Sequence, residues 1–390
     1  MESRPAETAP MRPLTAVSGP SESTAAPAIP AAVAARIAAA VESSRSAGTR
    51  RAYGSGWRRF TDWCTRNGHV ALPAHPVTVA AYLVDAADTV TAAGERAYAA
   101  GTLSAWASAI NHFHQATGHA SPTKHHLVTA ALSGIRRQYA TAGDRPRTQR
   151  APLLVSDIRH LVDTARAQCD GWADDVYERR DTALLLLGFA GAFRRSELAD
   201  LECRDVRLHR EDGLHIRLRK TKTDQEGRGV VRALPTTDFH ATCPPCAYVR
   251  WVQVVSAFDA GGRPSVIRLL RGRGPFENHV CRGGVPRVSA RVPLFRAIAK
   301  NGNLGTTPIS GAAIHKTIRR RAERAGYDVA LISQLGGHSL RSGFVTQAFR
   351  NGADAHAIMR QTGHTTPAML ERYARENAPL IGNAVKNIGL

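Results

Sequence analysis

Lysine, cysteine and long apolar segments are all scarce in this chain of 390 residues. Its six cysteines are too few and too scattered for a disulfide framework, so a cytosolic protein is the better expectation. The longest apolar run, Thr182–Phe193, is too short to span a bilayer, because a membrane helix needs about 20 apolar residues. These absences argue against a disulfide-stabilised secreted scaffold and against a membrane-spanning protein.

Acidic residues are also few, since 32 Asp and Glu stand against 52 Lys and Arg, which gives a formal net charge of +20. A strong basic excess without a lipid-binding signature points to nucleic acid. Only six of the basic residues are lysines, so 52 − 6 = 46 are arginines, which bind phosphate through an always-charged fork. A basic soluble protein with another role is the alternative that charge alone leaves open.

Composition divides the chain into four parts. Residues 1–28 are rich in Ala, Pro, Ser and Thr and are predicted to be a disordered tail. Apolar residues at three- and four-residue steps in 29–140 predict an all-helical domain. Residues 141–150 are interpreted as an extended basic linker, and residues 151–390 as a second domain.

The second domain is predicted to combine helices with one small antiparallel sheet. Leu214, Ile216 and Leu218 alternate with polar residues, a pattern typical of a half-buried strand. Val206 and Leu208 suggest a short strand before it, and residues 231–234 can return antiparallel, so a three-stranded sheet is predicted. The expected fold class is therefore mainly α with a small antiparallel β-sheet.

The last quarter of the chain contains most of the chemically active residues. His338 and Arg341 are three apart, so a helix places both on one face. His364 follows Gly363, which is well placed as a helix C-cap, and Tyr373 lies in a helix that begins at Thr366-Pro367. Together these residues supply a phenol as a nucleophile, a guanidinium that can bind a phosphate, and two imidazoles that can transfer protons.

Two segments earlier in the sequence contain a second arginine and a lysine that could complete the set formed by His338, Arg341, His364 and Tyr373. Arg194 follows the buried apolar helix, and Glu197 at the i+3 position could orient it, although such a pair is usually a surface salt bridge. Lys220 and Lys222 end the predicted strand. A lysine there can protonate a leaving oxygen, which arginine cannot, and an ordinary loop lysine is the alternative.

Together these residues resemble the tyrosine recombinase family, which includes phage integrases, the Xer recombinases and Cre. The resemblance covers nearly the whole chain after the tail, and it implies a two-domain DNA clamp with a helical core-binding domain and a catalytic domain. The family pattern of arginine, one variable residue and then Ser/Ala-Glu favours Arg194 over Arg195, and a Thr-Lys-Thr context favours Lys222 over Lys220. The implied catalytic residues match all six family positions, with Glu197 in support: Arg194, Lys222, His338, Arg341, His364 and Tyr373.

The resemblance implies a site-specific DNA recombinase that forms a 3′-phosphotyrosyl intermediate on Tyr373 and exchanges strands through a Holliday junction. In this reading His364 hydrogen-bonds the phosphate. A type IB topoisomerase-like enzyme, a hairpin telomere resolvase and a non-catalytic DNA-binding protein remain as alternatives. The implied partners are double-stranded recombination sites and further copies of the chain, as a dimer on each site and a tetramer in synapsis. Accessory DNA-bending or directionality factors are further candidates. No cofactor or membrane is implied, and the expected location is cytoplasmic and nucleoid-associated.

Clusters of basic residues are expected to contact the duplex, with a solvated helical face as the alternative. By resemblance, the segment 379–390 docks on a neighbouring protomer, and packing on its own domain is the alternative. The residues assigned to DNA are Arg50, Arg51, Arg58, Arg59, Lys124, Arg136, Arg137, Arg147 and Arg150.

Five cysteine and histidine positions between residues 240 and 281 raise the question of zinc. Cys243 and Cys246 have the spacing of zinc ligands, and His240, His279 and Cys281 could complete a site. However, Thr-Cys-Pro-Pro before an apolar run is also the ordinary start of a helix. The sequence therefore predicts no metal site.

Overall fold

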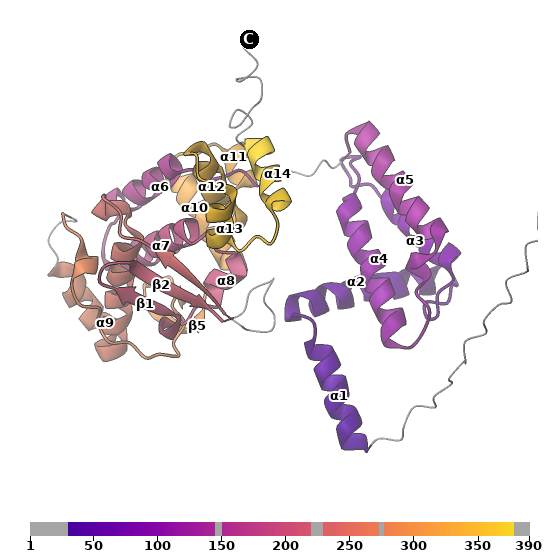
Figure 1. The fold of residues 1–390 in the computed structure, drawn as a ribbon, viewed down its shortest axis with the longest axis horizontal. Helices are drawn as coiled ribbons and strands as arrows, with labels where there is room; N and C mark the ends of the chain where they lie inside the picture. Colours follow the sequence, from indigo (N-terminus) through magenta and orange to yellow (C-terminus); the bar gives the residue numbers. More distant parts are fainter. Residues whose placement is uncertain (1–29, 145–149, 220–228, 273–276, 378–390) are drawn as a thin grey trace, which may run out of the picture. The chain divides into compact units, whose positions relative to one another are not determined.

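The computed structural model describes residues 30–144, 150–219, 229–272 and 277–377. The chain splits into two compact units, Met1–Arg147 and Thr148–Leu390 (Figure 1). The predicted tail, residues 145–149 of the predicted linker and the predicted docking segment 379–390 lie outside the described residues. Within the described ranges, no helix combines the length and the apolar character that crossing a membrane requires.

The first unit is a helical bundle. Its core contains Phe60, Leu83, Leu103 and Ile110, all fully buried. One cap is visible at Ser46, whose hydroxyl accepts a hydrogen bond from the Thr49 backbone N–H at 3.2 Å. The elements are α1 (Ala31–Ser43), α2 (Ala47–Arg66), α3 (Pro76–Asp88), α4 (Ala100–Ala116), the 3₁₀ turn η1 (Pro122–Lys124) and α5 (His126–Ala142).

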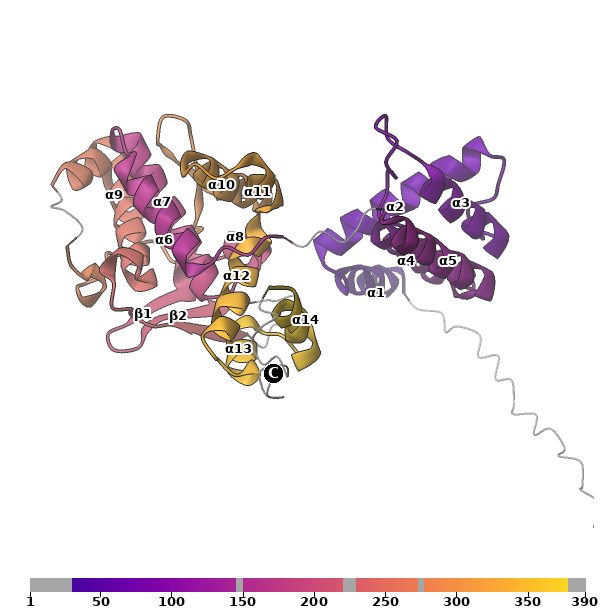
Figure 2. The ribbon, with the colours of Figure 1, turned by 90° about the horizontal axis from the view of Figure 1, so that it is seen from above.

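The second unit is built around two long helices, α7 (Trp172–Ala190) and α9 (Pro244–Arg271), which pack side by side (Figures 1 and 2). The apolar run 183–187 of α7 lies at the centre of the core. The remaining helical elements are α6 (Val155–Ala167), α8 (Arg195–Ala199), η2 (Cys203–Asp205), η3 (His240–Thr242), η4 (Val280–Arg282), α10 (Gly311–Arg324), α11 (Val329–Gln334), α12 (Gly337–Arg350), α13 (Ala355–Thr362) and α14 (Pro367–Asn377).

The predicted three-stranded antiparallel sheet is confirmed, in the order β1 (Val206–His209), β2 (Gly213–Leu218) and β3 (Val230–Leu234). The alternating residues Leu214, Ile216 and Leu218 are all buried, as their pattern indicates. A second sheet of two short strands, β4 (Arg296–Ile298) and β5 (Leu304–Pro308), was not predicted. Both strands are too short and too polar to show a clear alternation.

A buried ion cluster joins α7 to α10. Asp181 receives hydrogen bonds from Arg180 and Arg320, at 2.7 and 2.8 Å, and from Arg321 at 2.8 Å. Burial acts to raise the pKa of Asp181, but the three guanidinium groups outweigh this effect and lower it. The charged residues 178–181, which directly precede the predicted apolar run, are thus buried in α7 through ion pairs.

Candidate active site

A sharp turn after α7 positions Arg194. Ala192 in this turn has φ = +46°, a left-handed conformation that is uncommon for a residue with a side chain. Phe193 is fully buried and fixes the turn against the core. Glu197 in α8 then accepts two hydrogen bonds from Arg194, one from Nη1 to Oε1 at 2.7 Å and one from the backbone N–H to Oε2 at 2.8 Å. The carboxylate therefore fixes both the main chain and the guanidinium of Arg194.

Arg341, on α12, is almost completely buried beside this turn. Its Nη1 donates to the carbonyl oxygens of Ala192 and Thr362, at 2.8 and 2.6 Å, and its Nη2 donates to His364 Nε2 at 2.9 Å. Three of the five N–H groups of this guanidinium are thus bound to the protein. Burial, with smaller contributions from Arg194 and Arg232, lowers the pKa of Arg341 to about 10, so the side chain stays charged at neutral pH.

The hydrogen bonds around His364 define its tautomer. Its Nε2 must accept, because the Arg341 guanidinium can only donate. Its Nδ1 lies 2.9 Å from Thr362 Oγ1, which already donates its only proton to the Ile358 carbonyl oxygen at 2.8 Å. The proton of His364 is therefore on Nδ1, and the neutral ring orients Arg341 from its other nitrogen.

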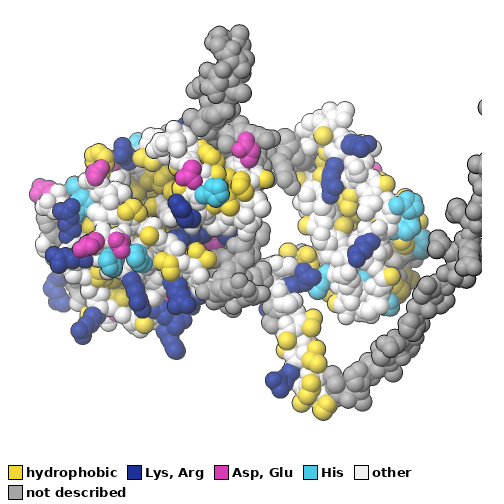
Figure 3. Space-filling model, in the orientation of Figure 1, with side chains coloured by type: hydrophobic (Ala, Val, Ile, Leu, Met, Phe, Trp, Pro, Cys, Tyr) yellow, Lys and Arg dark blue, Asp and Glu magenta, His cyan; other side chains and the backbone are white. Residues whose placement is uncertain are grey.

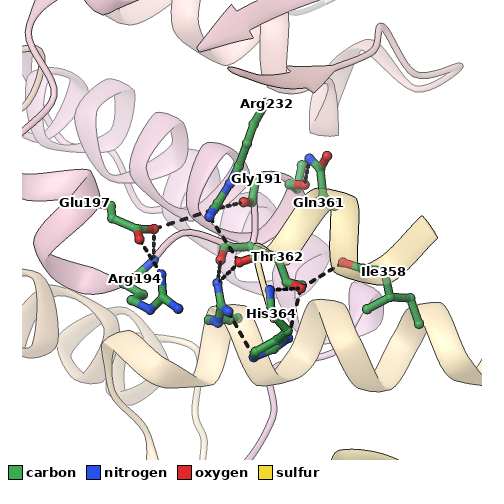
Figure 4. Close-up of polar contacts among 11 residues, drawn as sticks. Gly191, Arg194, Glu197, Arg232, Ile358, Gln361, Thr362 and His364 are labelled. Carbon is green, nitrogen blue, oxygen red and sulfur yellow. Dashed lines mark hydrogen bonds and ion pairs between the residues drawn. The ribbon is translucent and has the colours of Figure 1, made fainter. Parts of the chain in front are cut away.

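A further arginine, Arg232 on β3, joins the two halves of the site. It donates to the carbonyl oxygens of Gly191 and Thr362, at 2.6 and 3.1 Å, and its Nη1 lies 3.5 Å from Glu197 Oε2 (Figure 4). The carbonyl of Thr362 thus accepts from both Arg232 and Arg341. Burial lowers the pKa of Arg232, as expected for a cation with almost no exposed surface.

Tyr373, on α14, faces His338, on α12. The Tyr373 hydroxyl lies 2.9 Å from His338 Nε2. Leu370 on the same helix packs with Val345 and Ile358 and so holds α14 against α12 and α13. The Tyr373 ring centroid is also 5.9 Å from that of His364, which places the phenol next to the arginine-binding histidine.

The charges of this site favour an anion. Three guanidinium groups, those of Arg194, Arg232 and Arg341, gather around one carboxylate, that of Glu197, while His364 is neutral. The excess of positive charge is fixed by buried hydrogen bonds, so it requires little reorganisation when a phosphate arrives.

The structure brings together five of the six predicted catalytic residues, together with Glu197. The sixth, Lys222, and its alternative Lys220 lie outside the described residues. Arg232 was missed because a single arginine in a short strand resembles a solvent-facing residue. Its register gives a signal, since Arg232 pairs with the inward-facing Ile216 and lies two residues before the buried Leu234.

The residues predicted to contact DNA have mixed environments. Arg50, Arg51, Arg58, Lys124 and Arg137 are exposed. Three others are also exposed, and their hydrogen bonds are as follows: Arg59 to the Tyr98 hydroxyl at 2.8 Å, Arg136 to Ser104 Oγ at 2.9 Å, and Arg150 to the Ser333 carbonyl oxygen at 2.9 Å. Arg147 lies outside the described residues.

Basic side chains also gather on the second unit, where Figure 3 shows them over β1, β2 and α9. Arg207 on β1 and Arg217 on β2 are exposed. Neither residue was among those predicted to contact DNA.

Because His364 is buried as a neutral ring, we expect the folded state to lose stability at acidic pH. Burial, followed by the charge of Arg341, lowers the pKa of His364 from its ordinary 6.5 to about 3. Between these two pH values the unfolded state binds more protons at His364 than the folded state does. The contribution of His364 to stability is therefore complete above about pH 6.5 and is lost as the pH falls. Between pH 7 and 5.5 this residue should cost about 1 kcal/mol in the free energy of unfolding. Urea denaturation of the wild type and of His364→Asn at both pH values measures it, and an equal loss in the two proteins would contradict the assignment.

The sequence profile described as "Phage integrase family" matches residues 298–379. An integrase/recombinase xerD homolog of Selenomonas ruminantium is 30% identical over 351 residues, which cover 89% of this chain and 87% of that protein. The recombinase cre of Escherichia phage P1 is 24% identical over 82% of this chain and 81% of its own length. The crystal structure of XerA recombinase aligns with a TM-score of 0.38 and 16% identity, over 91% of this chain and 96% of that one.

Proposed function

The chain belongs to the tyrosine recombinase family, as a tyrosine-type site-specific recombinase, and from this premise we propose that it exchanges DNA strands through a 3′-phosphotyrosyl bond to Tyr373. The observation that carries the proposal is the 2.9 Å contact between the Tyr373 hydroxyl and His338 Nε2, next to a cluster of fixed arginines. A hydroxyl nucleophile, a base within hydrogen-bond reach and a preformed anion site are the parts that phosphoryl transfer to a side chain needs.

In the first step, the Tyr373 oxygen attacks the scissile phosphorus and the bond to the 5′-oxygen breaks. A phenol with a pKa near 10 is a poor nucleophile at neutral pH, so its proton must leave as the new bond forms. His338 Nε2 accepts this proton. The 5′-oxygen leaves as a hydroxyl, and the 5′-hydroxyl of a partner strand then attacks the phosphotyrosine in the reverse sense. The energy of the phosphodiester is thereby retained, and strands are exchanged through a Holliday junction.

Arg194 and Arg341 would bind the two non-bridging oxygens of the phosphate. Arg341 keeps two N–H groups for this purpose after its three bonds to the protein. The hydrogen bond between His364 and Arg341 supports a different role for His364 from the one that the family resemblance implies. Because its Nε2 accepts from Arg341, this ring cannot donate to a phosphate from the same atom, and we assign it as a positioning residue for Arg341.

Lys222 is proposed as the general acid for the leaving 5′-oxygen, on the family pattern alone. The exposed basic residues of the first unit would bind the DNA backbone, with a dimer on each recombination site and a tetramer in synapsis. Phosphate contacts of this kind make binding fall steeply with salt concentration.

A nicked suicide substrate tests the proposed function. Cleavage next to the nick should release a short strand and leave the chain linked to the DNA 3′ end through Tyr373, which peptide mapping would identify. Recombination should require two copies of the cognate site. Relaxation of supercoiled DNA without any pairing of sites would instead support the topoisomerase-like alternative.

Arg232→Met is expected to slow cleavage without weakening DNA binding, because Arg232 contacts the protein and not the substrate in this assignment. Its loss leaves the Gly191 carbonyl without its buried donor and Glu197 with one cation fewer, which should cost about 3 kcal/mol of unfolding free energy. We expect the single-turnover cleavage rate to fall at least about tenfold while Kd for DNA stays within about twofold.

Arg207→Met is the matched control for this variant, since Arg207 is an exposed arginine on β1 of the same sheet. It should retain the wild-type rate and stability. A cleavage rate for Arg232→Met that equals that of the control would show that Arg232 has no positioning role.

A further inference from the structure

Four potential metal ligands meet where α9 begins. Cys243 is the N-cap of α9 and Cys246 lies in its first turn, while His279 and Cys281 lie at the start of η4, more than 30 positions later in the sequence. One ligand atom from each residue lies within 4.8 Å of all the others. The three cysteines are buried and His279 is half-buried. His240, the fifth residue considered from the sequence, is not part of this group.

The spacing of these atoms is close to that of a tetrahedral zinc site. His279 Nδ1 lies 3.4 Å from Cys246 Sγ and 3.9 Å from Cys281 Sγ. With Zn–S bonds of about 2.3 Å and a Zn–N bond of about 2.0 Å, the ligand atoms of a tetrahedral site lie roughly 3.5 to 3.8 Å apart. Small side-chain shifts would therefore bring all four atoms into coordination.

The orientation of His279 is a second and independent observation. Its Nε2 faces the Asp238 carbonyl oxygen at 3.3 Å, and a carbonyl can only accept a hydrogen bond. The ring proton is therefore on Nε2, and the lone pair of Nδ1 points toward the sulfur atoms. A metal-binding histidine commonly has this arrangement, in which the distal N–H donates to a carbonyl or carboxylate.

The surroundings balance the charge of a zinc complex. Zn²⁺ with three thiolates and a neutral imidazole carries one net negative charge. The buried Arg250 lies one helical turn after Cys246 and donates to the carbonyl oxygens of His240 and Asn278, at 3.4 and 3.3 Å. Its guanidinium thus provides a fixed positive charge beside the thiolates and holds the two segments that flank the ligands.

We propose that Cys243, Cys246, His279 and Cys281 bind one structural Zn²⁺ ion. Four protein ligands complete the tetrahedron and leave no position for substrate, so the ion would stabilise the fold and take no part in strand transfer. It would join the start of α9 to the segment around η4, and α9 packs along α7, which leads into the Arg194 turn.

This proposal replaces the sequence-based expectation of no metal. The helix start predicted at Cys243-Pro244 is present, but a helix N-terminus and a zinc-binding turn are compatible. The deciding information, the approach of His279 and Cys281, comes from residues distant in the sequence.

Metal analysis of the full-length protein tests the site directly. We expect about one zinc per chain after purification with a tag that lacks histidine, and protein produced in cobalt-supplemented medium should show the absorption of thiolate-bound tetrahedral Co²⁺. The double variant Cys243→Ser/Cys246→Ser should lose both signals and have a Tm lower by about 5 °C or more. Cys169→Ser is the matched control, because Cys169 lies in the same unit outside the cluster, and it should retain both signals.

A second measurement on the wild type covers the case in which the double variant fails to fold. Titration with an organomercurial should release about one zinc per chain, as reported by a chromogenic chelator. Less than about 0.1 zinc per wild-type chain would overturn the proposal. So would unchanged zinc in the double variant, or a Cys243–Cys246 disulfide found by mass spectrometry.

Discussion

Tyr373→Phe should abolish the covalent DNA adduct while leaving DNA binding intact. The substitution removes the attacking oxygen, and loss of a nucleophile typically lowers the rate by a factor of about 10⁴ or more. The aromatic ring remains in its contact with Leu370 and Val345, so the fold should be retained. Loss of the hydroxyl also removes its hydrogen bond to His338, which should change the free energy of unfolding by only about 1 kcal/mol. Denaturing gels of the nicked-substrate reaction measure the adduct, and gel shifts measure binding.

Tyr327→Phe is a matched control for this change. Tyr327 is also in the second unit, and its hydroxyl donates to Asp157 Oδ1 at 2.7 Å, close to the helix start of α6. This variant should form the adduct at close to the wild-type rate. If Tyr373→Phe still formed a covalent adduct, a different residue would be the nucleophile and the proposed mechanism would be wrong.

Arg194→Met should lower the cleavage rate by about 10³-fold or more, the second largest effect that we expect. In the proposed mechanism its guanidinium stabilises the charge that develops on the phosphate, and removal of a single such donor costs about 10² to 10³ in rate even when the donor is uncharged. Folding should survive, because Glu197 keeps its ion pair with Arg232 and its hydrogen bond from the backbone of residue 194. Single-turnover cleavage at saturating protein separates this loss from any change in affinity.

Arg195→Met distinguishes the two neighbouring arginines. Arg195 is exposed at the start of α8, whereas Arg194 is held by Glu197. The Arg195 variant should cleave within a few-fold of the wild type. A much larger loss in Arg195→Met than in Arg194→Met would reverse the assignment of the phosphate-binding arginine.

The sequence alone predicted those site residues whose positions follow from local rules of helix formation. Gly363 has φ = +67° and ends α13, and Pro367 begins α14, so the spacing from His364 to Tyr373 was set by recognisable helix boundaries. The three-residue step from His338 to Arg341 likewise put both on one helix. These signals depend on neighbours in the chain, and the structure brings those residues together.

Contacts between segments that are far apart in the sequence could not be predicted from local patterns. Arg232 meets Thr362 across 130 positions of sequence, and no local pattern marks that pair. The same limit applies to His279 and Cys246, and to Asp181 on α7, where ion pairs with α10 permit the burial of a charged residue.

Arg232 and Arg341 are held mostly by hydrogen bonds to backbone carbonyls, those of Gly191, Ala192 and Thr362. A carbonyl is present whichever side chain a residue carries, so an alanine scan would pass over these supports, and sequence drift could leave them intact. For redesign of this enzyme toward new DNA targets, the path of the main chain through these residues is therefore the quantity to preserve. A grafted site that reproduced the catalytic side chains on a different turn would lack the acceptors that hold them.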